Sequence, residues 1–87
     1  MKPIRFTSHA EEKFAILLTH GCQVTRDQVV KTLQQPEKVH EGYKGRWIAQ
    51  SSLSADPLLN VIFVETETEI IVVTFYPGRR ERYEGAI

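Results

Sequence analysis

The stretch that decides the fold runs from residue 58 to residue 76 and reads LLNVIFVETETEIIVVTFY. Two runs of mostly apolar, β-branched and aromatic residues, 58–65 and 69–76, flank the polar link TET. Such runs favour β-strands, and a link this short requires antiparallel pairing, because a parallel crossover needs a dozen or more residues. The nearly continuous apolar character predicts that both strands are central in a sheet, with Val72, Val73 and Phe75 in the core and helices over one face.

Two further strand-like segments lie upstream, at residues 38–43 and 46–53. KG joins them to each other, and SADP joins the second one to residues 58–65. All three links have the length of a hairpin connection, so the four strands are expected to form an antiparallel meander. A short β-like segment, residues 4–7, stands apart near the amino end.

Two helices are expected between that segment and the meander. Ser8 and Glu11 have the spacing of a capping box, in which each side chain bonds the backbone amide of the other residue. Thr25 and Gln28 repeat this spacing, and the second helix must stop before Pro36. The apolar residues that recur at helical spacing are Ala10, Phe14, Leu17 and Leu18 in the first helix, and Val29, Val30 and Leu33 in the second. The predicted fold is α+β, with two amino-terminal helices packed on a four-stranded antiparallel sheet in one domain, residues 1–87.

The composition of the chain bears on its partners and its location in the cell. Eleven basic and eleven acidic residues give zero net charge, so no global charge argument favours nucleic acid or a membrane. The single cysteine, Cys22, and an amino terminus without the apolar core of a signal peptide fit a cytoplasmic protein. No metal-ligand box, glycine-rich phosphate loop or Ser-His-acid arrangement is present in the sequence, so no cofactor and no metal are expected.

Positive charge nevertheless gathers in three places: the first helix, the KGR hairpin and the carboxyl-terminal run YPGRRERY. These places hold His9 and Lys13, Lys44 and Arg46, and Arg79, Arg80 and Arg82. Each has a structural alternative: a solvated helix face, an ordinary hairpin tip, or a sheet edge protected by charge. His9 follows the expected helix cap directly, where the positive end of the helix dipole favours a neutral imidazole, which can act as a base. The alternative is that His9 is an ordinary residue at the start of the helix, without a catalytic role.

The whole chain resembles a bacterial and archaeal family of unknown function whose members are similar in fold to the RelE/ParE and BrnT toxins. The phrases that carry the resemblance are FTSHAEEKF, VVKTLQQPEKV, EGYKGRWIAQ and IIVVTFYPGRRERY. Its most specific parts are the histidine at the start of the first helix, the proline after the second, the G-x-x-G-R hairpin from Gly42 to Arg46, and the VVT-x-YP ending from Val72 to Pro77.

The resemblance implies a metal-independent endoribonuclease that is held in check by a cognate antitoxin. RNA cleavage of this kind uses the neighbouring ribose 2′-hydroxyl as nucleophile, so the protein must accept a proton, stabilise charge on the phosphate and protonate the leaving oxygen. The residues that match these roles are His9 as base, Arg46 and Arg79 on the phosphate, and Tyr76 at the leaving group. Those expected to bind RNA are Lys13, Lys44, Thr74, Arg80 and Arg82.

The zero net charge departs from the strongly basic character of RelE-like toxins, and affinity for RNA rests largely on neutralised phosphates. A ribosome-associated or narrowly chosen RNA is therefore the expected target. Two other functions stay open. One is a catalytically silent module that binds a protein by strand addition, and the other is a ParE-like inhibitor of another enzyme.

Overall fold

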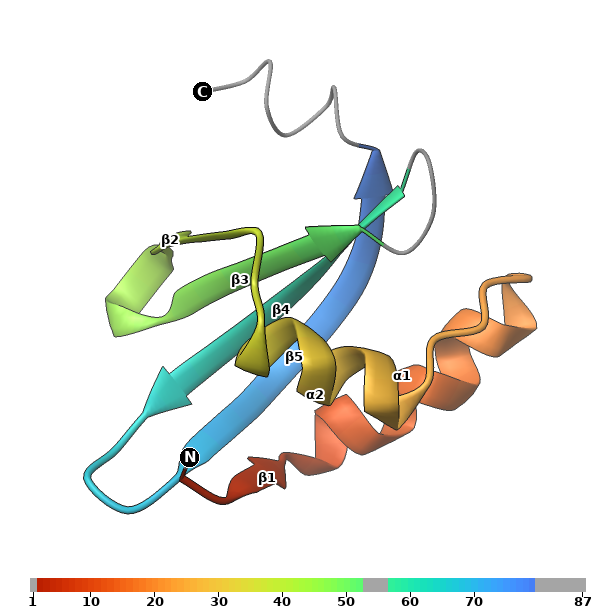
Figure 1. Cartoon of the computed structure of the whole chain (residues 1–87). Coiled ribbons are helices and arrows are strands. Elements are labelled where there is room, and N and C mark those ends of the chain that lie inside the picture. The colour runs from red at the N-terminus through yellow and green to blue at the C-terminus, as the bar shows by residue number, and fades with distance from the viewer. Residues whose placement is uncertain (1, 53–56, 80–87) are drawn as a thin grey trace.

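The computed structural model describes residues 2–52 and 57–79, apart from the side chains of Pro57 and Arg79. Helices and strands follow one another as β1 (Ile4–Phe6), α1 (Ser8–Thr19), α2 (Arg26–Gln34), β2 (Lys38–Glu41), the 3₁₀ turn η1 (Tyr43–Gly45), β3 (Trp47–Ser52), β4 (Pro57–Glu65) and β5 (Ile70–Arg79). The strands form one sheet in the order β1-β5-β4-β3-β2 (Figure 1). In the described part of the chain, no helix is long and apolar enough to cross a membrane.

The sheet has five strands and is mixed, so the predicted four-stranded antiparallel sheet is wrong in strand number and in type. Strands β2 to β5 pair antiparallel in chain order, as their short links require. The additional strand, β1, pairs parallel with β5, and Ile70 N donates to Pro3 O at 2.9 Å. The two helices therefore follow β1 and connect it to the meander, instead of opening the chain.

Helix α1 is capped by Thr7, and the predicted capping box of Ser8 and Glu11 is wrong. Thr7 is extended (φ −68°, ψ 163°), and its hydroxyl accepts from Ala10 N at 3.1 Å and donates to Val73 O at 2.9 Å. Pairing of β1 with β5 fixes this extended conformation one residue earlier than the sequence pattern indicates. His9 is consequently the second residue of α1, and the Glu11 carboxylate bonds the guanidinium of Arg26.

Helix α2 begins as the sequence predicts. Thr25 Oγ1 accepts from Gln28 N at 3.1 Å, and Gln28 Oε1 accepts from Thr25 N at 2.8 Å, which confirms the second capping box. Val24 and Val29 on either side are both buried in the core, in the positions of a hydrophobic staple. The helix ends at Gln34, before Pro36.

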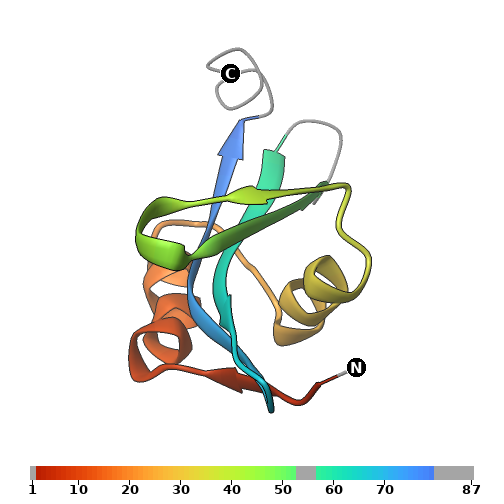
Figure 2. The ribbon, with the colours of Figure 1, turned by 90° about the vertical axis from the view of Figure 1, so that its left-hand side faces the viewer.

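Both helices cover the same face of the sheet, α1 over β1 and β5 and α2 over β3 and β4 (Figures 1 and 2). The buried residues of this layer are Ala10, Val24, Val29, Leu59, Val61, Val72 and Phe75. Val72 and Phe75 are in the core as predicted, whereas Val73 is half-buried. The reason is a bulge: Ile62 lies opposite Thr74 and Phe63 opposite Val72, so Val73 is the extra residue of β5.

Candidate functional site

The face of the sheet that points away from the helices carries two rows of side chains. Ala49, Val61 and Phe75 are directly opposite one another and point toward the helices, so the neighbouring residues on each strand point the other way. We call this surface the back face. Its first row is His40, Ile48, Ile62 and Thr74, and its second row is Lys38, Gln50, Asn60 and Tyr76.

The centre of the back face is a buried amide pair. Gln50 Nε2 donates to Asn60 Oδ1 at 2.6 Å, and both side chains are almost fully buried, at 3% and 0% exposure. Asn60 Nδ2 lies 3.4 Å from Tyr76 O on the next strand. Buried polar groups are retained where they are hydrogen-bonded, so this pair ties β3 and β4 in one register.

Two polar atoms of the first row lack such partners. His40 Nε2 and Thr74 Oγ1 are shielded from solvent, and neither has a hydrogen-bond partner among the described residues. A buried donor or acceptor left unpaired costs about 1–3 kcal/mol, and such groups often serve a purpose other than stability. Three interstrand spacings of about 4.8 Å put the two ends of the row about 14 Å apart along the sheet, which suits an extended ligand that crosses the strands.

The hairpin between β2 and β3 brings positive charge to one end of this row. Lys44 and Gly45 both have positive φ, 58° and 75°, which turns the chain tightly. Arg46 follows with extended backbone (φ −92°, ψ 158°), so strand alternation places it on the same face as Ile48. Gly42 fits the same corner, because an added Cβ would lie 3.1 Å from Arg46 O and 3.3 Å from Ile48 Cγ1.

The structure brings together only part of the set predicted from the sequence. Thr74 and Tyr76 lie two residues apart on β5 and share the back face, with Lys44 and Arg46 at the hairpin end of the same sheet. His9 is exposed and Lys13 is half-buried, both on α1, which packs on the opposite face. The geometry therefore separates His9 and Lys13 from Thr74 and Tyr76. Arg80, Arg82 and the side chain of Arg79 lie outside the described residues.

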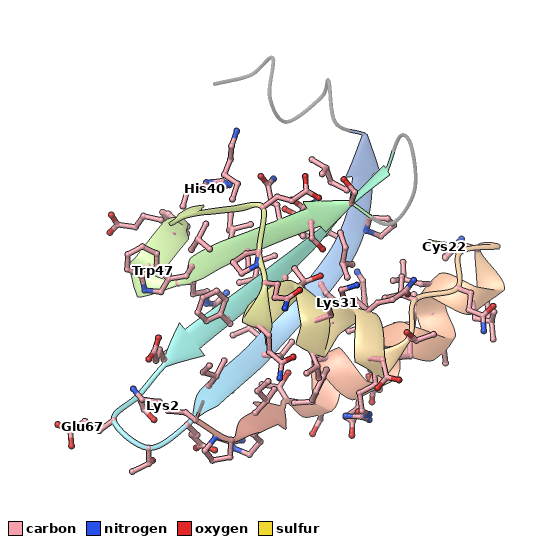
Figure 3. The ribbon with its side chains drawn as sticks, viewed as in Figure 1. Lys2, Cys22, Lys31, His40, Trp47 and Glu67 are labelled. Atoms are coloured by element: carbon pink, nitrogen blue, oxygen red, sulfur yellow. The ribbon has the colours of Figure 1, made fainter. Side chains whose placement is uncertain are left out.

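His40 is the back-face group that reasoning from the sequence missed, together with Gln50 and Asn60. His40 is half-buried, and it comes from β2, where Figure 3 labels it. The segment KVHE gives no chemical signal by itself, because the importance of His40 follows from its place opposite Ile48 in the same row as Thr74. Only the register of the strands reveals it.

A polar pocket lies away from this face. It has a volume of about 350 Å³ and lies between α2 and β3 on the helix side, and its lining residues are Gln28, Lys31, Thr32, Gln35, Glu37, Ser51 and Ser52. The Thr32 and Ser51 hydroxyls, 2.6 Å apart, join the helix to the strand there. Within residues 2–52 and 57–79, no three His, Cys, Asp or Glu side chains are grouped so that they could hold a metal ion.

Two solved structures are similar to this chain over most of their length. One is the solution structure of the conserved hypothetical protein HP0894 from Helicobacter pylori, at 18% identity and a TM-score of 0.56, covering 88% of this chain and 94% of that one. The other is the crystal structure of YafQ from E. coli strain BL21(DE3), at 12% identity and a TM-score of 0.51, covering 95% and 98%. The fold is shared.

This similarity confirms the fold that the sequence resemblance indicated. At such low identities it extends to the fold alone. No protein-family model matches the chain, and no curated protein matches it in sequence. The assignment of function therefore rests on the residues of the site.

Proposed function

We propose that the chain is a toxin-like, metal-independent endoribonuclease that binds RNA across the back face and the hairpin end of the sheet. The observation that carries the proposal is the row His40, Ile48, Ile62 and Thr74, whose two terminal side chains hold buried polar atoms without partners among the described residues. The RelE-like fold supports the same reaction class by analogy.

The roles follow from what cleavage by the ribose 2′-hydroxyl demands. His40, whose Nε2 is shielded from solvent in the free protein, accepts the proton of that hydroxyl once RNA binding exposes it, since imidazole is the side chain best suited to proton transfer near neutral pH. Arg46, with a planar fork of donors that matches phosphate oxygens, stabilises the charge of the transition state. Water protonates the leaving oxygen, and Tyr76, Thr74 and Lys44 hold the RNA backbone. Arg79, Arg80 and Arg82 make further contacts with the phosphates.

His9 is the second candidate for the base. It is exposed in the first turn of α1, where the helix dipole is positive, and Lys13 follows one turn later. With His9 as base, cleavage would take place on the helix side, and Thr74 and Tyr76 would not take part. Substitution of each histidine separately distinguishes the two arrangements.

We also propose what regulates this activity and which RNA it acts on. An acidic antitoxin would cover the positive hairpin end, because complementary charge speeds the capture of a partner. The zero net charge makes broad RNA binding weak, so an RNA presented by the ribosome, or one chosen by a narrow set of contacts, is the proposed target.

A protein-binding module without catalysis is the alternative function. The observation that favours it is strand β2, which ends the sheet and pairs on one side only, with β3, among the described strands. An extended peptide could add to such an edge.

The test is incubation of the purified protein with RNA in the presence of a chelator, followed by identification of the product ends. The proposal predicts cleavage with 2′,3′-cyclic phosphate ends, because the 2′-hydroxyl attacks the adjacent phosphate. Intact RNA, on and off ribosomes, would count against the enzyme and favour the binding module.

A further inference from the structure

The hairpin between β2 and β3 exposes an unusual amount of apolar surface. Tyr43 is 81% exposed, Val39 46% and Trp47 41%. Trp47 lies opposite Glu41, and Val39 lies diagonally across from Trp47 on the same face of the two strands. In the view of Figure 1 this end of the hairpin extends away from both helices, so neither helix covers it.

Positive side chains are interleaved with the two aromatic rings. Lys44 Nζ lies 5.6 Å from the centroid of the Tyr43 ring, and Arg46 is exposed between Tyr43 and Trp47 along the chain. Aromatic faces that alternate with cations are the combination that binds single-stranded nucleic acid, because bases stack on the rings while the cations neutralise phosphates. A partner protein with a purely apolar surface would leave these cations without a counter-charge.

One carboxylate lies within this patch. Glu41 is exposed and directly opposite Trp47, so it repels a phosphate at that point. The phosphates of a bound strand are therefore confined to the side of Lys44 and Arg46, which leaves the Trp47 ring to an uncharged base.

We propose that Tyr43 and Trp47 form a stacking platform for the bases of single-stranded RNA, with Lys44 and Arg46 on its phosphates. This inference rests on the proposed function in that RNA is the ligand. Tyr43 is three residues from His40, which is at most about 10 Å of extended chain. Trp47 shares the face of Ala49 by strand alternation, so a bound strand passes around the hairpin end from Trp47 to Arg46 and the back face. The platform selects single-stranded RNA over duplex RNA, in which the bases are already stacked.

The chain provides its own probe, because Trp47 is its only tryptophan. A mixed-sequence RNA of about twelve nucleotides with 2′-O-methyl riboses binds but lacks the nucleophile, so binding is measured without cleavage. Stacking should quench the emission of Trp47. Stacking of one base contributes about 1–3 kcal/mol, so Trp47→Ala should weaken binding by about 5- to 150-fold, and Trp47→Phe should restore most of the affinity.

The salt dependence separates stacking from charge. The logarithm of the binding constant falls with the logarithm of the salt concentration. Lys44→Ala should make this slope less steep by about 0.7, the value for one phosphate contact to a single strand, whereas Trp47→Ala should leave it unchanged. The same sequence annealed to its complement should bind more weakly and quench less.

The inference is overturned if Trp47→Ala binds the oligonucleotide as tightly as the wild type does, and if the oligonucleotide leaves the Trp47 emission of the wild type unchanged. The exposed patch would then be a protein-facing surface. This outcome is distinct from failure of the proposed function. If the oligonucleotide quenches Trp47 but unmodified RNA is not cleaved, the platform is supported and the enzyme is refuted. If unmodified RNA is cleaved but Trp47 is not quenched, the enzyme is supported and the platform is refuted.

Discussion

Replacement of Asn60 by alanine tests the structural account of the back face. Asn60 is fully buried and accepts from Gln50 Nε2 at 2.6 Å, so Asn60→Ala leaves the Gln50 amide unpaired in a site with 3% exposure. An orphaned buried polar group costs about 1–3 kcal/mol, and the missing amide leaves a small cavity as well. The contact of Asn60 Nδ2 with Tyr76 O, at 3.4 Å, is long and contributes little.

The expected loss of unfolding free energy is therefore about 2–3 kcal/mol, which lowers Tm by roughly 8–24 °C for a domain of this size. Urea unfolding followed by circular dichroism measures it for Asn60→Ala, Gln50→Ala and the double variant. The double variant should lose less than the sum of the two, with a coupling of about 1 kcal/mol. Lys38→Ala, in the same row but exposed, is the control and should stay within about 0.5 kcal/mol of the wild type.

Two results would refute this reasoning. If Asn60→Ala loses less than about 0.5 kcal/mol, the amide is not buried as the structure has it. If the two single losses simply add, Gln50 and Asn60 do not bond each other.

Three other predictions concern the caps, the core and the hairpin. Thr7→Ala should cost about 1 kcal/mol of unfolding free energy through the lost cap, while Ser8→Ala stays within about 0.5 kcal/mol; thermal melts that show the reverse would restore Ser8 as the cap. Val72→Asp buries an unpaired charge and should leave the protein insoluble or unfolded, so a soluble variant with native Tm contradicts the core assignment. Lys44→Gly should raise the unfolding free energy by about 0.5–1 kcal/mol because it relieves the positive φ of 58°, and it should weaken RNA binding; Lys44→Ala, measured alongside, should bring no such gain in stability.

The sequence predicts those parts of the fold that depend on local chemistry. The Thr25 box, the stop before Pro36 and the antiparallel pairing of β2 to β5 are all read from neighbouring residues, and the structure confirms them. The cap of α1 at Thr7 is not predicted, because it depends on pairing between β1 and β5, which are more than sixty residues apart. A three-residue strand is too short to show an alternating pattern that would reveal its place in the sheet.

The candidate site was harder to predict, because it depends on strand register. A shift of one residue moves every side chain of a strand to the other face, and β5 contains such a shift between its pairings with Ile62 and Phe63. Thr74 and Tyr76 were chosen for their hydroxyl groups, which the sequence shows directly. His40 was missed, since only the pairing of β2 with β3 places it in the row of Thr74.

The central claim, that RNA is cleaved on the back face, is tested most directly by single-turnover cleavage rates of His40→Ala and His9→Ala. The account predicts that His40→Ala loses about a hundredfold to ten-thousandfold, the usual contribution of a general base, while His9→Ala, whose exposed side chain lies on the helix side, cleaves like the wild type. Urea unfolding of both variants controls for folding. Wild-type cleavage by a folded His40→Ala, together with loss of cleavage in His9→Ala, would contradict the account and move the active site to α1.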